Sequence, residues 1–434
     1  MRQPKRKKQM IVQSLRGRPQ LALLEEGKLI EFYSEPPVDR ERVGNIYRGR
    51  SVNVLPGMEA AFVDIGLEKN AFLHVDDLLP AHIEKKPLVK PVVTDLVRVG
   101  QSIVVQVKKE QNGNKGARIT THFTIPGRWV VLLPHADYVA VSRKITVEAE
   151  RTRLKQIAEQ LRLPGEGLII RTVAEGVAAE LLELDIRQMR VLWEEAMLKD
   201  KQSNATHTLL YRDLALIPRL IRDLFTEEVT EIIVDDPQMV EDIQWLLCQI
   251  SPNYANRVSL YSETTPIFTA YSISQELERA LERKITLPSG GNLIFDQTEA
   301  LMVIDVNTGK FVGEQDLEKT VTATNLEAAE QIARLIRLRD LSGIILVDFI
   351  DMTQEENRRL VAERLVTLCA EDRTKTIIVG WTKLGLMEIT RKKVRGALNG
   401  LELTLYNDIL RSCFLTTFYL IYLTYCANIG QYVV

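Results

Sequence analysis

The sequence predicts a multidomain α/β protein with a small β-barrel inserted among its α/β parts. The chain has 434 residues, enough for several domains with separate hydrophobic cores. Residues 44–110 contain short apolar stretches separated by glycine-containing turns, which is typical of a small barrel. Residues 303–351 read as strand, helix and strand, which is the pattern of a βαβ crossover.

The N-terminal region is all β in this interpretation. Residues 9–33 predict a hairpin, with QMIVQSL and LALLEEGKLIEFY on either side of a GRPQ turn. The barrel begins at GNIYRGRSVNVLPGMEAAFVDIGLEKNAFLHVDDLL and continues through GQSIVVQVKKE, where PG and IGLEKN separate the strands. Five short strands with glycine turns indicate an OB-fold.

The middle of the chain mixes strands and helices. RWVVLLPHADYVAVS and GEGLIIRTVA predict strands, and residues 147–163 and 176–204 are charged and have helical periodicity. Residues 207–250 carry both kinds of signal, including EIIVDD. TLPSGGNLIFDQTEALMVIDVNTG predicts two strands joined by a glycine turn.

The βαβ unit brings two aspartates together. Its helix is indicated by apolar residues at helical spacing: Leu326, Ala329, Ala333 and Ile336. We expect Glu330 and Arg334 to pair across one turn on another face. Because the flanking strands VIDVN and GIILVD must be parallel, Asp305 and Asp348 emerge at the same end of one sheet, where α/β folds place their sites.

These acids indicate metal chemistry. A buried carboxylate without a partner is costly, and two aspartates with Asn307 suit a hard cation such as Mg²⁺. The alternative is that each aspartate caps a turn or pairs with an arginine. A carboxylate-held Mg²⁺ commonly acts on phosphate esters, so together with a nucleic-acid-binding barrel the site indicates a nuclease. HExxH, GxSxG, Walker and dinucleotide-binding motifs are absent, and the five histidines lack metal-ligand spacing.

Composition adds little about partners. The formal charge of −2 gives no argument for nucleic-acid binding, so any basic surface must be local. The basic segment MRQPKRKKQM is either a solvated arm or an RNA-contacting arm, and no signal-peptide pattern follows it. Four cysteines without a CxxC pair suit a reducing environment, and we expect a cytoplasmic protein.

Several long strings, in the same order along the chain, resemble the ribonuclease E/G family of bacterial endoribonucleases from about residue 9 to residue 395. They are NIYRGRSVNVLPGMEAAFVDIG, GNKGARIT, LPSGGNLIFDQTEALMVIDVNTG, TNLEAAEQIARLIRLRDLSGIILVDFIDM and GLMEITRKKVR. The chain has no long polar scaffold tail and is therefore more similar to the short members of the family.

The resemblance implies RNase H-like and DNase I-like α/β subdomains with an inserted S1 (OB-fold) barrel and a 5′-sensor region. The RNase H-like subdomain would form from two segments, 1–35 and 216–282. Between them would lie the S1 domain at 36–122 and the 5′-sensor region at 123–215. The DNase I-like catalytic subdomain would follow at 283–395, and an atypical apolar tail at 396–434.

The resemblance also assigns roles in catalysis. Asp305 and Asp348 match the residues that hold the catalytic Mg²⁺, and Asn307 matches the residue that orients the metal-bound water or the scissile phosphate. Asp351 has no matching role, and we interpret it as a structural acid.

A pocket for a 5′-monophosphate is the second implied site. Arg171 and Thr172 in GLIIRT match it, Arg391 in ITRKK joins them, and Gly127 and Val131 line it. A guanidinium binds a phosphate bidentately, and a hydroxyl adds a directed donor. Without the resemblance, Arg171 would be interpreted as an exposed arginine at a strand end.

RNA contacts are implied in the barrel. Phe62 and Phe72 match positions that stack on RNA bases, and Lys115 in GNKGA matches a basic RNA contact. The alternative is barrel core, because AAFVDIG alternates like a half-buried strand.

The C-terminal tail departs from the family. The CPxCxG motif that shares Zn²⁺ between two subunits is missing, and Cys413 and Cys426 stand 13 residues apart without a Gly/Pro knuckle. We therefore expect no zinc link, which weakens the expectation of a homodimer or homotetramer. Residues 413–425 are strongly apolar but too few to span a bilayer. A reading-frame change, an interfacial or partner-binding segment that could associate with a membrane, and a transmembrane helix are the three explanations.

The sequence thus predicts a Mg²⁺-dependent endoribonuclease that cleaves single-stranded RNA, favours 5′-monophosphorylated substrates and leaves 5′-phosphate products, in rRNA maturation and mRNA decay. DNA is not an expected substrate. The alternative is an RNA-binding protein with weak or no cleavage because of its altered C-terminus.

Overall fold

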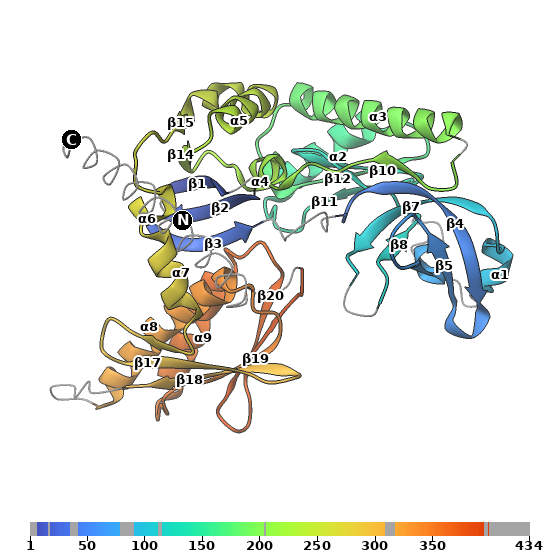
Figure 1. Cartoon of the computed structure of the whole chain (residues 1–434). Helices are drawn as coiled ribbons and strands as arrows, with labels where there is room; N and C mark the ends of the chain where they lie inside the picture. Colours follow the sequence, from blue (N-terminus) through green and yellow to red (C-terminus); the bar gives the residue numbers. More distant parts are fainter. Residues whose placement is uncertain are drawn as a thin grey trace, which may run out of the picture.

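The described residues form four β-sheets with helices packed between and around them (Figure 1). The computed structural model describes residues 7–15, 18–34, 42–78, 91–111, 115–203, 205–308, 317–394 and 398. Figure 1 shows the barrel to one side, α3 along the top and the sheet that contains β17–β19 at the bottom. The mixed α/β class predicted from the sequence is confirmed.

The predicted barrel is present and closed. Its strands are β4 (Ile46–Leu55), β5 (Ala60–Asp64), β6 (Ala71–His74), β7 (Ser102–Lys109) and β8 (Arg118–Thr120). They follow the order β4-β5-β6-β8-β7, and β4 also pairs with β7, which closes the ring. Gly49 is required where strands approach closely, because a Cβ there would lie 2.6 Å from the Asp64 carbonyl oxygen. Short helical turns η1 (Pro56–Met58) and η2 (Val75–Asp77) and the helix α1 (Val93–Leu96) connect the strands, and β13 (Thr208–Tyr211) joins β4 from outside.

The second sheet lies beside the barrel and follows the order β11-β12-β10-β9. Its strands are β9 (Ile125–Pro126), β10 (Val130–Pro134), β11 (Val139–Val141) and β12 (Glu166–Ile170). The two predicted charged helices are confirmed as α2 (Glu148–Leu161) and α3 (Ala179–Gln202), and η3 (Thr172–Ala174) follows β12. Leu154 and Ala158 of α2 and Leu182, Ile186 and Met189 of α3 bury their side chains in the core of this region.

The third sheet joins the N-terminal strands to a segment that comes much later in the chain. Its order is β15-β14-β1-β2-β3, with β1 (Lys8–Leu15), β2 (Arg18–Glu25), β3 (Lys28–Ser34), β14 (Val229–Val234) and β15 (Val258–Leu260). One face packs against α4 (Leu216–Leu224) and α5 (Pro237–Ile250), which η4 (Pro252–Arg257) follows. The predicted hairpin is confirmed as the antiparallel pair of β1 and β2, but its second arm divides into β2 and β3, so the segment forms three strands instead of two. LALLEEGKLIEFY bends at Glu26 and Gly27, which both have positive φ angles, 48° and 75°.

The fourth sheet contains the predicted βαβ unit. Its order is β16-β17-β18-β19-β21-β20, with β16 (Lys284–Thr286), β17 (Asn292–Gln297), β18 (Leu301–Asn307), β19 (Gly343–Asp348), β20 (Thr376–Trp381) and β21 (Met387–Arg391). The helices α6 (Ile267–Ala270), α7 (Ile273–Leu281), α8 (Leu317–Leu338) and α9 (Glu355–Cys369) complete this region. β18 and β19 are parallel and directly paired, as predicted.

The predicted Glu330–Arg334 pair on α8 is wrong. Arg334 forms an ion pair with Glu276 of α7 at 2.7 Å and donates to the Leu29 carbonyl oxygen. Glu330 pairs instead with Arg364 of α9. Both side chains lie where neighbouring helices supply partners, so tertiary contacts override an i,i+4 pair worth only about 0.2–0.5 kcal/mol.

None of the described helices is both long and apolar enough to cross a membrane. Apart from Leu398, the tail assigned to 396–434 lies outside the described residues, and so do Cys413 and Cys426. The basic segment at residues 1–6 also lies outside them.

Candidate functional site

The two aspartates singled out in the sequence face each other at the ends of β18 and β19. In the parallel register Asp305 is the direct partner of Asp348. Asn307 follows two residues after Asp305 and therefore lies on the same face of β18. Its Nδ2 donates a 2.7 Å hydrogen bond to Oδ2 of Asp305. The three predicted catalytic residues are thus brought together.

The acid pair, Asp305 and Asp348, carries negative charge that the described residues do not neutralise. Burial raises the pKa of Asp348, and the neighbouring carboxylates of Asp305 and Asp351 raise it further. Within the described chain, no lysine or arginine forms an ion pair with either member of the acid pair. The alternative of an arginine-paired aspartate therefore finds no support among these residues. Asp351 lies close enough to add to the repulsion.

This set of donors fits a hard cation. Mg²⁺ is commonly held by one or two carboxylates, with water and substrate oxygens in the remaining positions. In the region of the chain that the structure describes, no group of three or more His, Cys, Asp or Glu side chains is arranged to hold a metal. A cation at the acid pair would therefore keep much of its coordination shell for water or substrate.

The acid pair lies on the open face of its sheet. Strand residues alternate between faces, and Met302, Ile304 and Val306 of β18 are buried in the core that α8 shares. Asp305 and Asp348 belong to the opposite face. On the same face Ile344 and Ile377 are 44% and 45% exposed, so a large substrate can reach it.

Four of the five predicted phosphate-pocket residues lie around the end of β12. Nη1 of Arg171 donates to the Gly127 carbonyl oxygen at 2.7 Å, and the backbone N–H of Arg171 donates to the Trp129 carbonyl oxygen. Val131 lies on β10, which pairs with β12. The Thr172 hydroxyl lies 2.7 Å from the Ser142 hydroxyl.

Gly127 is required at the turn before β10. A Cβ there would lie 2.5 Å from the Asp185 carboxylate. That carboxylate accepts hydrogen bonds from the backbone N–H groups of Arg128, Trp129 and Val130 at 2.8–3.0 Å. Burial nevertheless raises the pKa of Asp185. The turn that carries the predicted pocket is therefore held by an acid on α3.

Asp223 forms an ion pair with Arg171, the arginine of the predicted pocket. Its carboxylate lies 2.7 Å from Nη1 of Arg171 and also pairs with Arg222 at 3.0 Å. Burial favours the protonated acid, but the contacts with Arg222 and Arg171 outweigh it and lower the pKa of Asp223. An incoming phosphate must therefore compete with an internal carboxylate for Arg171.

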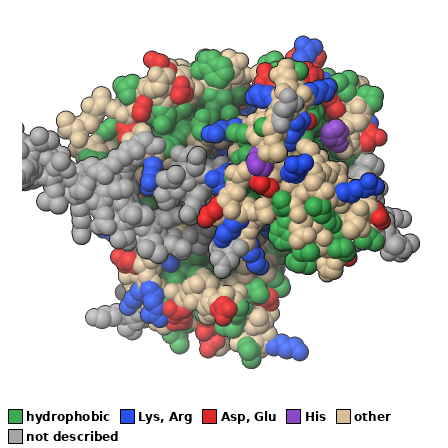
Figure 2. Space-filling model, turned by 45° about the vertical axis from the view of Figure 1, so that its right-hand side comes forward, with side chains coloured by type: hydrophobic (Ala, Val, Ile, Leu, Met, Phe, Trp, Pro, Cys, Tyr) green, Lys and Arg blue, Asp and Glu red, His purple; other side chains and the backbone are tan. Residues whose placement is uncertain are grey.

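The surroundings of Asp223 are rich in arginine. Arg373 donates to the carbonyl oxygens of Asp223 and Leu224 at 2.8 and 3.0 Å. Burial and the positive charges of Arg171 and Arg373 lower the pKa of Arg128 to about 10. We call Arg128, Arg171, Arg222 and Arg373 the arginine cluster. Its positive charge favours an anion. On the surface in view, Figure 2 shows Lys and Arg side chains along the centre, with some Asp and Glu side chains among them.

Arg391, the fifth predicted pocket residue, has other partners. Its guanidinium is buried, pairs with Asp340 and Asp372, and donates to the Leu341 carbonyl oxygen at 3.0 Å. Arg391 is linked to the pocket only indirectly, through Asp372. Asp372 directly precedes Arg373, and the Asp372 carbonyl oxygen accepts a hydrogen bond from Lys144 at 2.8 Å. The structure does not place the Arg391 guanidinium in contact with Arg171 or Thr172.

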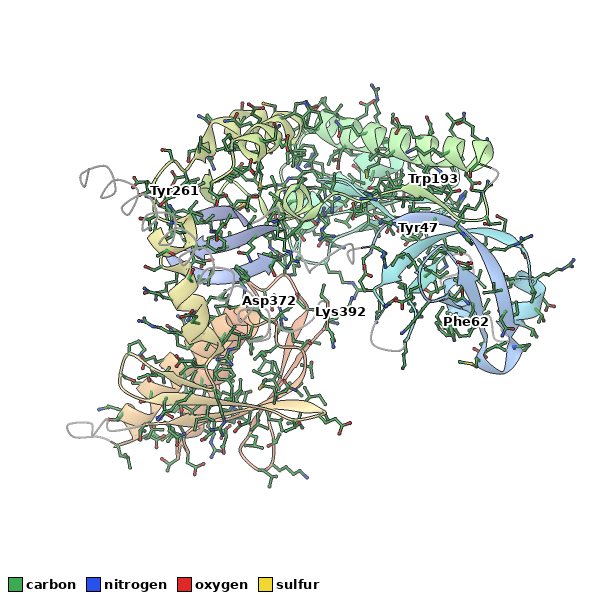
Figure 3. All side chains as sticks on the ribbon, in the orientation of Figure 1. Tyr47, Phe62, Trp193, Tyr261, Asp372 and Lys392 are labelled. Atoms are coloured by element: carbon green, nitrogen blue, oxygen red, sulfur yellow. The ribbon has the colours of Figure 1, made fainter. Side chains whose placement is uncertain are left out.

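The two predicted stacking residues lie together on the barrel wall. Phe62 and Phe72 are opposite each other on β5 and β6, and their ring centroids are 5.8 Å apart. Their strand neighbours Val63 and Leu73 fill the barrel core, whereas both phenylalanines are half-buried and belong to none of the core clusters of the described residues. Figure 3 shows Phe62 on the barrel, on a different region of the molecule from Asp372.

Lys115 is exposed on the segment that enters β8. The Ala117 carbonyl oxygen of that segment accepts from the N–H of Phe72 at 2.7 Å, which links the lysine to the phenylalanine pair. His74 extends the aromatic row, with its ring centroid 6.3 Å from that of Phe72.

Sequence reasoning missed Asp185, Asp223 and Arg373. These residues lie in ordinary helical or loop contexts, such as LIRDLF, and the contacts that bring them to the pocket join residues more than 50 positions apart in the sequence. No short-range signal marks them.

Comparisons with known proteins agree with this architecture. Residues 124–394 match the model of the Ribonuclease E/G family. The chain is 43% identical over 392 residues to Ribonuclease G of Salmonella typhimurium (strain SL1344), covering 89% of this chain and 80% of that protein. It is 42% identical to Ribonuclease G of Haemophilus influenzae, covering 87% of this chain and 78% of that protein.

The longer relatives match less of their own length. Ribonuclease E of Haemophilus influenzae is 36% identical over 382 residues, covering 87% of this chain but 41% of that protein. The similarity to the short members of the family, expected from the sequence, is confirmed. The chain therefore belongs to the ribonuclease E/G family and is a ribonuclease G-like endoribonuclease.

Proposed function

We propose that this endoribonuclease is metal-dependent, uses Mg²⁺ at Asp305 and Asp348, and favours single-stranded RNA with a 5′-monophosphate. The acid pair carries this proposal, because two facing carboxylates without a cationic partner among the described residues need a positive charge to complete them. Its position on an open sheet face suits a polymeric substrate.

Each residue of the candidate catalytic site has a role in this proposal. Asp305 and Asp348 would hold the metal ion, which when bound stabilises charge on the phosphate and lowers the pKa of a coordinated water. Asn307 keeps Asp305 oriented through its 2.7 Å hydrogen bond and would orient the water or the scissile phosphate. Phe62, Phe72 and Lys115 would hold bases and backbone of the bound strand.

Preference for a 5′-monophosphate would come from Arg171 and Thr172, with Gly127 and Val131 lining the pocket. The support is the positive charge of the arginine cluster and the hydroxyl of Thr172 at the same strand end. Arg391 would contribute by fixing Asp372 and so the adjacent Arg373, rather than by binding the phosphate itself.

Finer features of the family extend the proposal. Residues 1–35 with 216–282 would form an RNase H-like subdomain, and 283–395 a DNase I-like subdomain. The mixed sheet made by β1–β3 with β14 and β15 supports the first assignment. The processes served would be rRNA maturation and mRNA decay, in the cytoplasm, without a shared Zn²⁺.

The test is cleavage of a 5′-monophosphorylated single-stranded oligonucleotide in Mg²⁺, comparing the wild type with Asp305→Asn. We expect cleavage by the wild type and a loss of about 10³-fold or more in the variant. Asp296→Asn is the matched control, because Asp296 lies on the adjacent strand, exposed and paired with Arg283 at 2.6 Å. It should cleave like the wild type.

Each failure has a separate meaning. RNA binding without cleavage by the wild type would favour the alternative of an RNA-binding protein. Equal cleavage by the wild type and Asp305→Asn would refute the role of the acid pair. Equal rates on 5′-hydroxyl and 5′-monophosphate substrates would remove the sensor while leaving the nuclease in place.

A further inference from the structure

Helix α3 carries two apolar stripes on opposite sides. Leu182, Met189 and Ala196, at intervals of seven residues, are buried against the second sheet. Two residues further on, a second stripe repeats at the same interval with Leu184, Val191 and Leu198. At 100° per residue the two stripes lie about 200° apart around the helix. One faces the core and the other faces away from it.

The outer stripe is open. Leu184, Val191 and Leu198 are 44%, 52% and 55% exposed, and Leu181 and Leu192 beside them are 40% and 39% exposed. Figure 1 shows α3 along the upper edge of the molecule, outside the second sheet. A single exposed leucine needs no explanation. A line of apolar residues that are spaced two helical turns apart, over about four turns, marks an interaction surface.

A line of alternating charge runs along one side of the outer stripe. Again at seven-residue intervals, Glu180, Arg187, Glu194 and Lys201 follow each other with signs −, +, −, +. The other side carries Leu181, Gln188, Glu195 and Gln202. Arg187 pairs with Glu183 within the helix, whereas Glu180, Glu194 and Lys201 form no ion pair within the described residues.

We propose that the outer stripe of α3 docks on α3 of a second copy of this chain, antiparallel, with the two-fold axis at Val191. The symmetry then places Leu184 near the partner copy's Leu198 and Val191 near its own equivalent. Charged residues on the same side meet in opposite pairs: Glu180 with the partner copy's Lys201, and Arg187 with the partner copy's Glu194.

The charge pattern selects this occupant and this direction. A parallel pair would bring the alternating line against the opposite side of the partner helix, with Glu194 beside the partner copy's Glu195, twice by symmetry. The antiparallel pair has four opposite-charge contacts and no like-charge contact along these lines. Self-complementarity of one patch is what an isologous interface requires. The contact is small, so the association is weak and concentration-dependent.

Cross-linking tests the geometry directly. In Val191→Cys the two thiols approach each other across the axis, so mild oxidation of the full chain should give a covalent dimer at about 10-fold the yield of the wild type, whose native cysteines set the background. Leu192→Cys is the matched control, because its side chain points about 100° away. Equal dimer yields from the two variants would overturn the proposal.

A charge exchange separates docking from damage to the fold. Arg187→Glu places two acids together and should weaken dimerisation at least ~10-fold in sedimentation analysis. The double variant with Glu194→Arg restores opposite signs and should restore the dimer, although each change alone weakens it. A dimer insensitive to Arg187→Glu, a wild type that stays monomeric at high concentration, or a double variant that stays monomeric would each contradict the antiparallel pair.

Discussion

The acid pair and the arginine cluster differ in whether the protein compensates their charges. At the acid pair, burial and the facing like charges raise the pKa of Asp348, and no lysine or arginine of the described residues forms an ion pair with either aspartate. In the arginine cluster, Asp223 sits among Arg171, Arg222 and Arg373, and its pKa is lowered. The acid pair needs a bound cation to compensate its charge. The arginine cluster already has an internal partner, which a ligand must displace.

This difference bears on binding and on stability. Uncompensated carboxylates cost stability, which a bound cation returns. A compensated arginine cluster stabilises the fold but binds an anion more weakly, because the ligand competes with a carboxylate already at 2.7 Å. We expect the loss of a carboxylate from the acid pair to lower activity but not stability. We expect the loss of Asp223 from the arginine cluster to improve substrate binding but lower stability.

The largest expected effect is at the acid pair. Asp348→Asn removes one of the two facing carboxylates and should lower kcat/KM by about 10³-fold or more. Because it also removes repulsion, its free energy of unfolding without metal should equal or exceed that of the wild type. Single-turnover cleavage measures the loss of activity, and urea unfolding measures the free energy of unfolding. A variant that is as active as the wild type but less stable would contradict the difference between the two sites.

Arg171→Gln should produce the next largest effect. Hydrogen bonds between charged groups contribute about 1.5–3 kcal/mol, so cleavage of a 5′-monophosphorylated oligonucleotide should fall about 10- to 100-fold. Cleavage of the same oligonucleotide with a 5′-hydroxyl should change little. If both substrates slow by the same factor, Arg171 does not recognise the 5′ end.

Asp223→Asn should act in the opposite sense and more weakly. Without the competing carboxylate, Arg171 is freed, and the KM for the 5′-monophosphorylated substrate should fall about 5-fold. The fold should lose about 1–3 kcal/mol, because Arg222 loses its nearer carboxylate partner. Asp213→Asn is the matched control, since Asp213 contacts Arg222 at 3.5 Å but not Arg171, and it should leave the KM unchanged.

The smallest effect is the response of stability to acid. The lowered pKa of Asp223 contributes stability above its ordinary pKa of 3.8, and this contribution is lost as the pH falls through the folded value. The raised pKa of Asp348 means the reverse: its penalty is present at neutral pH and disappears as the pH falls toward 3.8. Urea unfolding with a chelator, at about pH 3 and pH 6, measures these contributions. Relative to the wild type, the free energy of unfolding that Asp223→Asn loses should be smaller at the lower pH. The free energy of unfolding that Asp348→Asn gains should also be smaller there. Parallel pH curves for the two variants would contradict the contrast.

Much of the framework was predictable from local patterns. Helical periodicity predicted α2, α3 and α8, and strand alternation with glycine turns predicted the barrel. At 9–33 the hairpin of β1 and β2 was predicted but the second reversal was missed, because EEG inside a long apolar run is a weak turn signal, and only the pairing of β2 with β3 shows the reversal.

The candidate site was partly predictable for the same reason. A short crossover forces β18 and β19 to be parallel, so Asp305 and Asp348 had to emerge at one end of the sheet. The direct opposition of the two acids depends on the register, which packing against α8 selects. The outward direction of Phe62 likewise followed only once Val63 was seen in the barrel core.

From the sequence alone followed most of the helices and strands, the small barrel, the parallel β18–β19 pair and the family, because these depend on local spacing and on long matching strings. Which charges meet became clear from the folded chain: Asp223 pairs with Arg171, Arg391 with Asp340 and Asp372, and Glu330 with Arg364 rather than Arg334. The physical reason is that an ion pair depends on distance in space, and these partners lie far apart along the chain or on different helices, where no local period connects them.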